Sequence, residues 1–279
     1  MAGEQRTIVL TGASDGIGAI AARALAGPST NLILVGRSSQ KLAPIAAETG
    51  GATPFTADFA HLSQVRDLAA QIAGSVDSID VLMNNAGGTF NPSQRTADGH
   101  EPNFQINHLA PFLLTNLLRD RLAAAGSSLV LNTASVGNLA GSVDLDDLDF
   151  DRRRAFGGRT YGTAKLMNIL FTRGIAQRWT DDKIYSAAVH PGPAATSFGR
   201  DSRLVGLAYR SPIARFVTIT PEQGAAPPLI ALAERGADPS INGVYFSRHK
   251  PNGLENRQAH NQRLIDGLWE KSAELTGLN

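Results

Sequence analysis

Short apolar runs alternate with longer stretches of helical periodicity along this chain. Short runs that are rich in β-branched residues and bounded by glycine or polar residues are typical of buried strands. Such runs occupy residues 7–10, 31–35, 53–56, 81–83, 128–132, 184–189 and 243–246. The pattern therefore predicts a sheet of about seven strands, with the last of them at an edge.

Segments with apolar residues at three- and four-residue spacing follow most of these runs. They predict helices over residues 19–25, 41–48, 63–76, 99–125, 159–179, 220–234 and 261–275. Alternating strands and helices imply parallel βαβ units. The chain is therefore predicted to be α/β, with a Rossmann-type doubly wound parallel sheet and helices on both faces. No repeat or break in composition divides it, so residues 1–279 are predicted to form a single domain.

A glycine-rich turn joins the first predicted strand to the first predicted helix. Glycines permit a tight bend there, and the helix N-terminus offers free N–H groups to a pyrophosphate. The spacing is Gly-x-x-x-Gly-x-Gly, which differs from the usual Gly-x-Gly-x-x-Gly of dinucleotide-binding domains. A strand–helix turn that merely needs glycine is the alternative. The turn predicts cofactor contacts from Gly12, Ser14, Asp15, Gly16, Ile17 and Gly18.

The second predicted strand ends at Gly36, followed by Arg37 and Ser38. In adenine dinucleotide folds, an acidic residue at this point binds the ribose 2′-hydroxyl, whereas an arginine accommodates a 2′-phosphate. The guanidinium and the adjacent hydroxyl suit a phosphate. NADP(H) is therefore favoured over NAD(H), although Arg37 could also be a solvated loop residue.

Tyr161 and Lys165 lie four residues apart in a predicted helix, so their side chains share one face. A neighbouring ammonium favours the phenolate and lowers the pKa of a tyrosine towards neutral pH, where acid–base catalysis is most efficient. Such a pair also occurs in many helices as a half-buried tyrosine and a solvated lysine. Asn107 in the middle of another predicted helix indicates either a local kink or a buried polar role.

Composition narrows the classes of function. The chain has 279 residues, a formal net charge of +1, a hydrophobic fraction of 42% and no cysteine. These values argue against a nucleic-acid-binding protein and exclude disulfides and thiolate chemistry. The histidines show no metal-binding spacing, and no signal peptide or membrane-spanning apolar stretch is present. We expect a cytoplasmic protein that binds a small molecule or a cofactor.

Taken together, these motifs resemble those of the short-chain dehydrogenase/reductase family. They occur in the family's order over about residues 7–196. The matching positions are Thr11, Gly12, Gly16, Gly18, Asp58, Asn84, Asn85, Ala86, Gly87, Asn107, Ser135, Tyr161, Lys165, Pro191, Gly192 and Thr196.

The resemblance implies four catalytic residues. Tyr161 would donate the proton during carbonyl reduction and accept it during alcohol oxidation. Lys165 would lower the pKa of Tyr161 and bind the nicotinamide ribose. Ser135 would polarise the substrate carbonyl, and Asn107 would anchor a water that links Lys165 to solvent.

It also implies further cofactor contacts. Asp58 would meet the adenine, and Asn85, Ala86 and Gly87 would line the adenosine side. Pro191, Gly192 and Thr196 would lie near the nicotinamide carboxamide. Taken singly, some of these residues have structural alternatives: Ser135 as a strand-end cap, Thr196 as a helix N-cap and Asn84 as a turn residue.

An acidic insertion at residues 144–150, followed by three arginines at 152–154, resembles the branch that holds retinol dehydrogenases and WW-domain oxidoreductases. Residues 268–272 are also similar to that branch. The resemblance implies a substrate lid at residues 197–220, whose apolar side chains suggest a lipophilic substrate. It leaves a retinoid and a ketone equally open. Residues 256–279 are predicted to form a C-terminal helical extension.

The sequence thus predicts an NADP-dependent oxidoreductase that transfers a hydride between nicotinamide and a lipophilic ketone or aldehyde, or the corresponding alcohol. The first alternative is a non-catalytic NADP-binding regulator on the same fold. The second is an epimerase or dehydratase, although those relatives usually carry a Gly-x-x-Gly-x-x-Gly turn. A homodimer through the helix of Tyr161 is also expected from the resemblance.

Overall fold

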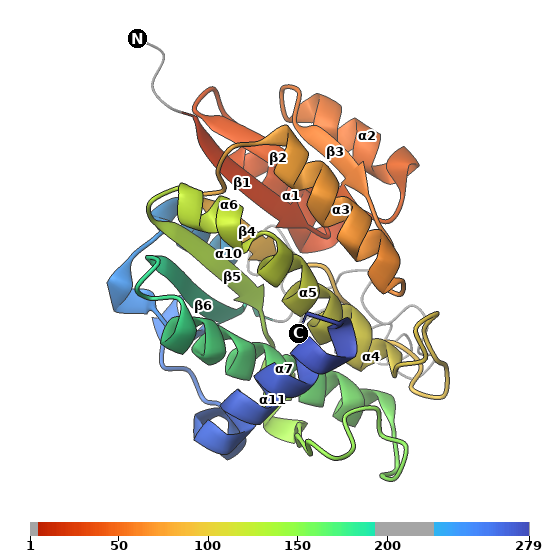
Figure 1. Cartoon of the computed structure of the whole chain (residues 1–279). Helices are drawn as coiled ribbons and strands as arrows, with labels where there is room; N and C mark the ends of the chain where they lie inside the picture. Colours follow the sequence, from red (N-terminus) through yellow and green to blue (C-terminus); the bar gives the residue numbers. More distant parts are fainter. Residues whose placement is uncertain (1–4, 193–225, 279) are drawn as a thin grey trace, which may run out of the picture.

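A single mixed sheet runs through the structure, a computed structural model that describes residues 5–192 and 226–278 (Figure 1). Its strand order is β3-β2-β1-β4-β5-β6-β7-β8. Strands β1 to β7 pair in parallel, and β8 pairs antiparallel with β7. The strands are β1 (Arg6–Thr11), β2 (Thr30–Gly36), β3 (Thr53–Thr56), β4 (Val81–Asn84), β5 (Ser128–Thr133), β6 (Ile184–His190), β7 (Val244–Ser247) and β8 (Lys250–Pro251).

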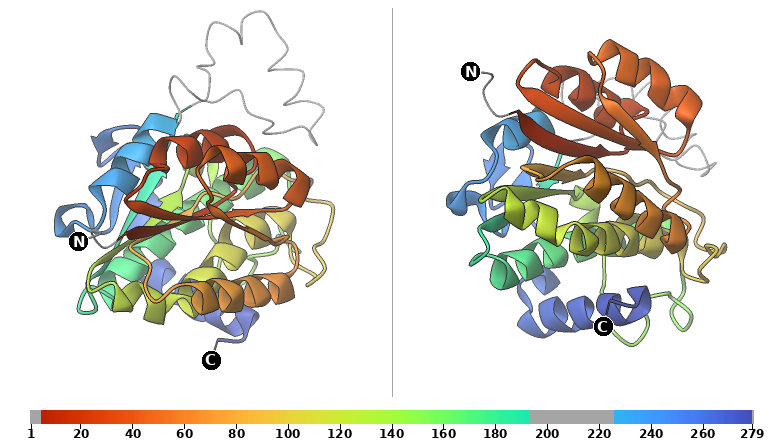
Figure 2. Two further views of the ribbon diagram at one scale, coloured as in Figure 1. Left: turned by 90° about the horizontal axis from the view of Figure 1, so that it is seen from above. Right: turned by 45° about the horizontal axis from the view of Figure 1, so that its top comes forward.

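Helices cover both faces of this sheet (Figure 2). One face carries α1 (Gly16–Leu25), α2 (Ser39–Glu48) and α10 (Ala226–Arg235). The other carries α3 (Leu62–Ser75), α4 (Pro102–Phe104), α5 (Ala110–Leu117), α6 (Arg119–Ala124) and α7 (Gly157–Arg178). Short helical turns are η1 (Gln105–Leu109), η2 (Val136–Ala140), η4 (Pro239–Ile241) and η5 (Arg257–His260). The predicted α/β fold is confirmed.

The order of the strands determines where a ligand can bind. The chain moves outwards from β1 through β2 to β3 and then returns to β4 on the other side of β1. In open parallel sheets, this reversal leaves a crevice at the carboxyl ends of the strands. The residues that follow β1, β2, β4, β5 and β6 are therefore brought to one edge.

The elements differ from the prediction at two points. The sheet has eight strands in the described residues, because a two-residue strand, β8, pairs with β7 and takes the edge. The helix predicted over 99–125 is divided by the π-helical turn η1 and by a break at Leu118. Asn107 lies inside η1, so the expected local irregularity is present. The helix predicted over 220–234 is described only from Ala226, and the segment 197–220 lies outside the described residues.

The C-terminal helix α11 (Gln262–Thr276) packs across the outer surface of α7 (Figure 1). Its Trp269 contacts Phe112, Phe171 and Trp179, at ring-centroid distances of 5.2, 5.7 and 5.5 Å. Helix α11 therefore forms a further layer outside α7 and extends the hydrophobic core on that side of the sheet. In the described ranges, no helix combines the length and the apolar character needed to cross a membrane.

Candidate active site

A cavity of about 970 Å³ opens at the carboxyl edge of the sheet. It brings together nearly all the residues that the sequence predicts for the site. Asn107 is absent from the wall, and Thr196 lies outside the described residues. The predicted residues in the wall are Gly12, Ser14, Asp15, Gly16, Ile17, Gly18, Arg37, Ser38, Asp58, Asn85, Ala86, Gly87, Ser135, Tyr161, Lys165, Pro191 and Gly192.

The glycines of the first turn permit contacts that a larger residue would prevent. A Cβ on Gly12 would lie 2.8 Å from the Cα of Ala86, and one on Gly18 would lie 2.0 Å from the carbonyl oxygen of Gly12. The carboxylate of Asp15 accepts a hydrogen bond of 2.7 Å from the backbone N–H of Gly16 and caps α1. The turn is therefore packed tightly against the end of β4, and the N-terminus of α1 faces the cavity.

Thr11 and Asn85 join the ends of β1 and β4. The hydroxyl of Thr11 accepts hydrogen bonds of 3.0 Å from the backbone N–H groups of both Asn85 and Ala86. The side-chain amide of Asn85 donates back to the carbonyl of Thr11 at 3.1 Å. These bonds fix the wall between the glycine turn and the rest of the cavity.

Basic side chains gather where β2 ends. Arg37 is exposed and lines the cavity, and Ser38 caps α2 by accepting a bond of 3.4 Å from the N–H of Lys41. A Cβ on Gly36 would lie 3.1 Å from the hydroxyl oxygen of Ser14, so the turn leaves little room for an acidic side chain there. Lys41 also lines the cavity and was missed by the sequence analysis. Its position in the first turn of α2, close to Arg37, was the available signal.

Tyr161 and Ser135 approach one another because α7 and η2 are in unusually close contact. A Cβ on Gly162 would lie 2.4 Å from the carbonyl oxygen of Gly137. A Cβ on Gly137 would lie 3.3 Å from Cε1 of Tyr161 and 3.4 Å from Oγ of Ser135. The phenol ring and the hydroxyl therefore flank the same point of the wall. Ser135 also caps η2, accepting a bond of 3.1 Å from the N–H of Gly137, so its structural alternative is present too.

Lys165 is buried behind Tyr161. Its ammonium nitrogen donates to the carbonyl of Thr133 at 3.0 Å and lies 5.6 Å from the centroid of the Tyr161 ring. The side-chain amide of Asn168 donates to the same carbonyl at 3.1 Å. Burial lowers the pKa of Lys165 from 10.5 to about 7. Near neutral pH, small changes in the surroundings of Lys165 therefore alter the fraction of molecules in which it is protonated.

Asn107 supports the site from behind the wall. Its side-chain oxygen accepts a bond of 3.0 Å from the N–H of Gly88, and its amide donates to the carbonyl of Gly88 at 3.0 Å. A Cβ on Gly87 would lie 2.4 Å from this oxygen and 3.4 Å from the Lys165 nitrogen. Asn107 is thus fully buried and polar, as expected, and only Gly87 separates it from the lysine.

Several wall residues could not have been found from motifs. Thr89, Phe90, Ile106 and Val136 line the cavity and belong to loops or to helix interiors without a recognisable pattern. His190 also lines the cavity, at the end of β6, and burial lowers its pKa, with a smaller contribution from the charge of Arg248.

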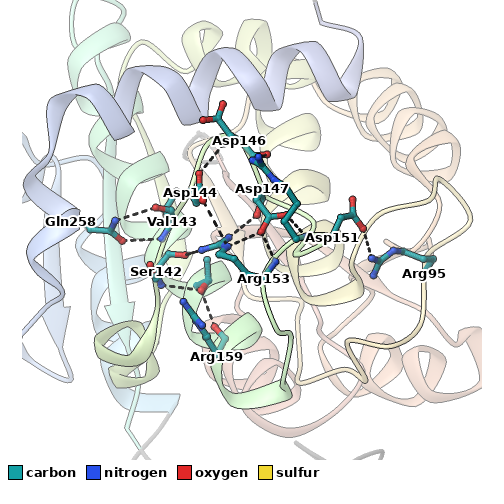
Figure 3. A network of polar contacts seen from close by, with 12 residues as sticks. Arg95, Ser142, Val143, Asp144, Asp146, Asp147, Asp151, Arg153, Arg159 and Gln258 are labelled. Carbon is teal, nitrogen blue, oxygen red and sulfur yellow. Dashed lines mark hydrogen bonds and ion pairs between the residues drawn. The ribbon is translucent and has the colours of Figure 1, made fainter.

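The acidic insertion between Ser135 and Tyr161 forms an ordered loop (Figure 3). Arg153 lies at its centre, donates to the carboxylate of Asp147 at 2.8 Å and to the carbonyl of Ser142 at 2.9 Å, and stacks over the ring of Phe150. Gln258 forms two hydrogen bonds with the backbone of Val143. The insertion thereby ties the N-terminus of α7 to the segment that precedes α11.

The fold and the cavity together define a dinucleotide-binding oxidoreductase of the Rossmann type. The family model for "short chain dehydrogenase" matches residues 6–204. DnrU of Streptomyces sp. (strain C5), assigned as a daunorubicin C-13 ketoreductase, is 38% identical over 277 residues, which cover 98% of this chain and 93% of DnrU. Retinol dehydrogenase 13 of Homo sapiens is 35% identical over 288 residues, covering 98% of this chain and 85% of that protein.

A solved structure of an uncharacterised protein from Mycobacterium paratuberculosis is similar, with a TM-score of 0.78 and 30% identity, covering 98% of this chain and 94% of the other. The chain belongs to the short-chain dehydrogenase family. It is an NAD(P)-dependent oxidoreductase that acts on CH–OH and C=O groups.

Proposed function

We propose that this protein is an NADP-dependent oxidoreductase for a lipophilic ketone or aldehyde, or the corresponding alcohol. The observation that carries the proposal is the meeting of Ser135 and Tyr161 at Gly137 in a cavity that also contains Arg37 and Lys41. A hydroxyl and a phenol at one point suit a carbonyl oxygen. The basic pair at the other end of the cavity suits a phosphate.

The residues present fit a nicotinamide dinucleotide. The glycine turn keeps the N-terminus of α1 open towards the cavity, where free N–H groups would hold the pyrophosphate. Arg37, Ser38 and Lys41 would hold a 2′-phosphate, and Asp58 the adenine. Asn85, Ala86 and Gly87 would line the adenosine side, and Pro191, Gly192 and Thr196 the carboxamide. When bound, the nicotinamide supplies or accepts the hydride.

Ser135, Tyr161 and Lys165 would then share the remaining chemistry. In reduction, the phenol of Tyr161 would give its proton to the carbonyl oxygen as the C=O π bond breaks and the carbonyl carbon accepts the hydride. The hydroxyl of Ser135 holds that oxygen and stabilises the charge that develops on it. Lys165 favours the phenolate that results. In oxidation, the phenolate takes the proton from the alcohol.

The phenolate of Tyr161 must recover a proton after each reduction. Lys165, whose nitrogen lies 5.6 Å from the centroid of the Tyr161 ring, is a candidate donor because its pKa of about 7 permits proton exchange at neutral pH. Asn107 lies on the other side of Gly87, where it would anchor a water between Lys165 and solvent.

Phe90, Ile106 and Val136 support a lipophilic substrate because they line the cavity. The names of two relatives also describe carbonyl or alcohol chemistry, on daunorubicin in one and on retinol in the other. The segment 197–220, expected to be a lid, lies outside the described residues.

A panel of lipophilic ketones and aldehydes, assayed by NADPH oxidation, tests this proposal. We expect turnover of some of them, and a loss of about 10³-fold in kcat for Tyr161→Phe, since general acid catalysis contributes 10²–10⁴-fold. The Kd for NADPH should remain within about twofold of the wild type. Full activity of Tyr161→Phe would refute the role of the phenol. Tight NADPH binding without turnover of any compound would instead favour the non-catalytic regulator.

The cofactor preference has its own test. Arg37→Ala should raise the KM for NADPH by about tenfold or more and leave the KM for NADH nearly unchanged, because a charge-assisted bond contributes about 1.5–3 kcal/mol. An enzyme that prefers NADH, and in which Arg37→Ala has no effect, would contradict the assignment.

A homodimer is a separate proposal. The outer surface of α7, where such a contact was expected, is covered by α11 of the same chain. Any dimer would therefore involve α11 itself or another surface. Light scattering on the purified protein distinguishes a dimer from a monomer.

A further inference from the structure

Two asparagines hold one loop of the cavity wall in the same way. The backbone N–H of Phe90 donates to the side-chain oxygen of Asn103 at 2.9 Å, and the side-chain amide of Asn103 donates to the carbonyl of Phe90 at 3.0 Å. Asn107 makes the equivalent pair of bonds with Gly88. Four helical residues advance by about 6 Å, and two extended residues advance by about 6.7 Å. The spacing between Asn103 and Asn107 along the helix therefore matches the spacing between Phe90 and Gly88 along the loop.

Asn103 also reaches the catalytic helix. Its side-chain amide lies 3.1 Å from the hydroxyl oxygen of Thr160, the residue before Tyr161, and donates at 2.7 Å to a carboxylate oxygen of Glu101. The other oxygen of Glu101 accepts from the N–H of Phe104 at 2.7 Å. Glu101, Asn103 and Thr160 are all buried. One amide thus joins the wall at Phe90 to the start of α7.

Glu101 fixes the direction in which the Asn103 amide points. A carboxylate offers only acceptors, so the NH₂ group of Asn103 must face it, and the oxygen then faces the N–H of Phe90. Burial raises the pKa of Glu101, whereas hydrogen bonds from Asn103, Phe104 and Thr160 act in the opposite direction. Rotation of the Asn103 amide would leave buried groups unpaired, which is costly.

We propose that Asn103 is a positioning residue that sets the distance between Phe90 on the substrate wall and Tyr161 on α7, and thereby the choice of substrate. This inference rests on the proposed function. Phe90 and Thr89 line the cavity, and the side-chain amide of Asn103 reaches both the backbone of Phe90 and the hydroxyl of Thr160, the residue before Tyr161. A shift of about 1 Å in a substrate wall can cost about 10²-fold in rate.

The kinetic test compares two substrates from the panel, a bulky ketone and a small aldehyde. Asn103→Leu keeps the size of the side chain and removes its hydrogen bonds. We expect kcat/KM for the bulky ketone to fall about tenfold or more relative to that for the small aldehyde. The Kd for NADPH should change by less than about twofold. Equal loss for both substrates would refute the role in substrate choice.

Ser186→Ala is the matched control. Ser186 is also buried and donates to the carbonyl of Thr172 at 2.7 Å, but it does not line the cavity. This variant should keep the wild-type ratio of the two kcat/KM values. A changed ratio in the control would show that general loosening of the fold alters substrate choice, and would overturn the proposal.

Hydrogen exchange tests the contact without any turnover. In Asn103→Leu the amide of Phe90 should exchange about tenfold faster or more, while the amide of Gly88, held by Asn107, stays protected. If the amides of Phe90 and Gly88 in Asn103→Leu both exchanged at the wild-type rate, the proposal would be refuted, even if no substrate were known. If the wild type showed no carbonyl activity, but the Phe90 amide alone lost protection in Asn103→Leu, the proposed function would be overturned. The contact between Asn103 and Phe90 would still be supported.

Thr160→Val provides a second variant if Asn103→Leu does not fold. It removes the Thr160 hydroxyl and leaves the two bonds between Asn103 and Phe90. The amide of Phe90 should therefore remain protected, while kcat falls about threefold or more because the start of α7 is released. Unchanged kcat would refute the link between Asn103 and the catalytic helix.

Discussion

The two faces of the central sheet are built from the same strands but have different interiors. Towards α1, α2 and α10, the strands contribute a cluster of apolar side chains, among them Ile8, Leu34, Met83 and Leu131. Towards α3, α5 and α7, the next residues along β4 and β5 are Asn84 and Asn132, buried within the sheet. We refer to these as the apolar face and the polar face.

A ladder of side chains crosses the polar face. The amide of Asn84 donates to the hydroxyl of Thr115 on α5 and to the side-chain oxygen of Asn132, both at 2.9 Å. Asn132 donates in turn to the hydroxyl of Thr172 on α7 at 2.9 Å. Asn84 is therefore a buried strand residue, and its interpretation as a turn residue is wrong. The ladder joins α5 and α7 through two neighbouring strands.

The two faces differ in what their side chains contribute: one mainly stabilises the fold, and the other positions helices and loops. Apolar contacts are non-directional and stabilise the fold through burial. Buried amides must meet partners in fixed directions, so they specify the positions of helices and loops. This specificity has a cost: the Asn84 Oδ1 and Ser128 Oγ atoms are buried without a hydrogen-bond partner in the described part of the chain. Lys165 and Asn107 are buried on the same side as the ladder.

Lys165→Met should have the largest effect of the variants considered, and it should separate activity from stability most clearly. Activity should fall about 10²–10⁴-fold, as expected for a group that supports acid–base catalysis. Stability should rise by about 1–3 kcal/mol at pH 6.5, because the variant no longer buries an ammonium, while Asn168 still donates to the carbonyl of Thr133. Steady-state kinetics and denaturant unfolding measure the two effects.

The pH dependence provides the control for this variant. Below pH 7 both folded and unfolded wild type carry the Lys165 proton, so the cost of burial is complete. Between pH 7 and 10.5 only the unfolded state holds it, and the wild type gains stability as pH rises. The advantage of Lys165→Met should therefore shrink at pH 9. An advantage independent of pH would mean that burial of the charge is not its cause.

Ile8→Ala tests the apolar face. Ile8 lies near the start of β1, away from the carboxyl edge, with 2% of its surface exposed. The variant should lose about 2–5 kcal/mol of unfolding free energy. The KM for NADPH and the KM for the carbonyl substrate should both remain within about twofold of the wild type. A large change in either would mean that the apolar face also determines the geometry of the site.

His108→Phe tests the polar face at acid pH, and its effect should be the smallest. His108 is buried among Phe104, Phe112 and Phe171, and burial lowers its pKa from 6.5 to about 3. Between these pH values the unfolded state binds the proton and the folded state does not, so the wild type loses stability as pH falls. At pH 5 this loss should be about 2 kcal/mol relative to pH 7.5, and the variant should lose less. Denaturant unfolding at both pH values checks the difference.

The fold was predictable because its signals are local. Most of the parallel strands are short apolar runs, and the predicted strand at 53–56 matches β3. The glycine turn and the Tyr161–Lys165 pair also have local signals, since their spacing alone brings the chemistry together. The two-residue strand β8 has no such signal, because its existence depends on a neighbour in space.

The supporting residues of the site could not be predicted in the same way. Asn103 looks like any polar residue near the start of a helix, and Glu101 like a solvated acid. Their roles depend on the loop at Gly88–Phe90 approaching this helix, where the N–H of Phe90 donates to Asn103. The sequence does not contain these distances.

The sequence by itself determined the alternation of strands and helices, the edge of the sheet where the cavity opens, and the candidate reactive groups, because periodicity and spacing act within a few residues. The tertiary structure decided which buried side chains serve the site. Only folding brings Gly137 against Gly162, and Asn103 between Phe90 and Thr160. These contacts join residues far apart in the chain, and a directional hydrogen bond forms only where both partners have already been placed.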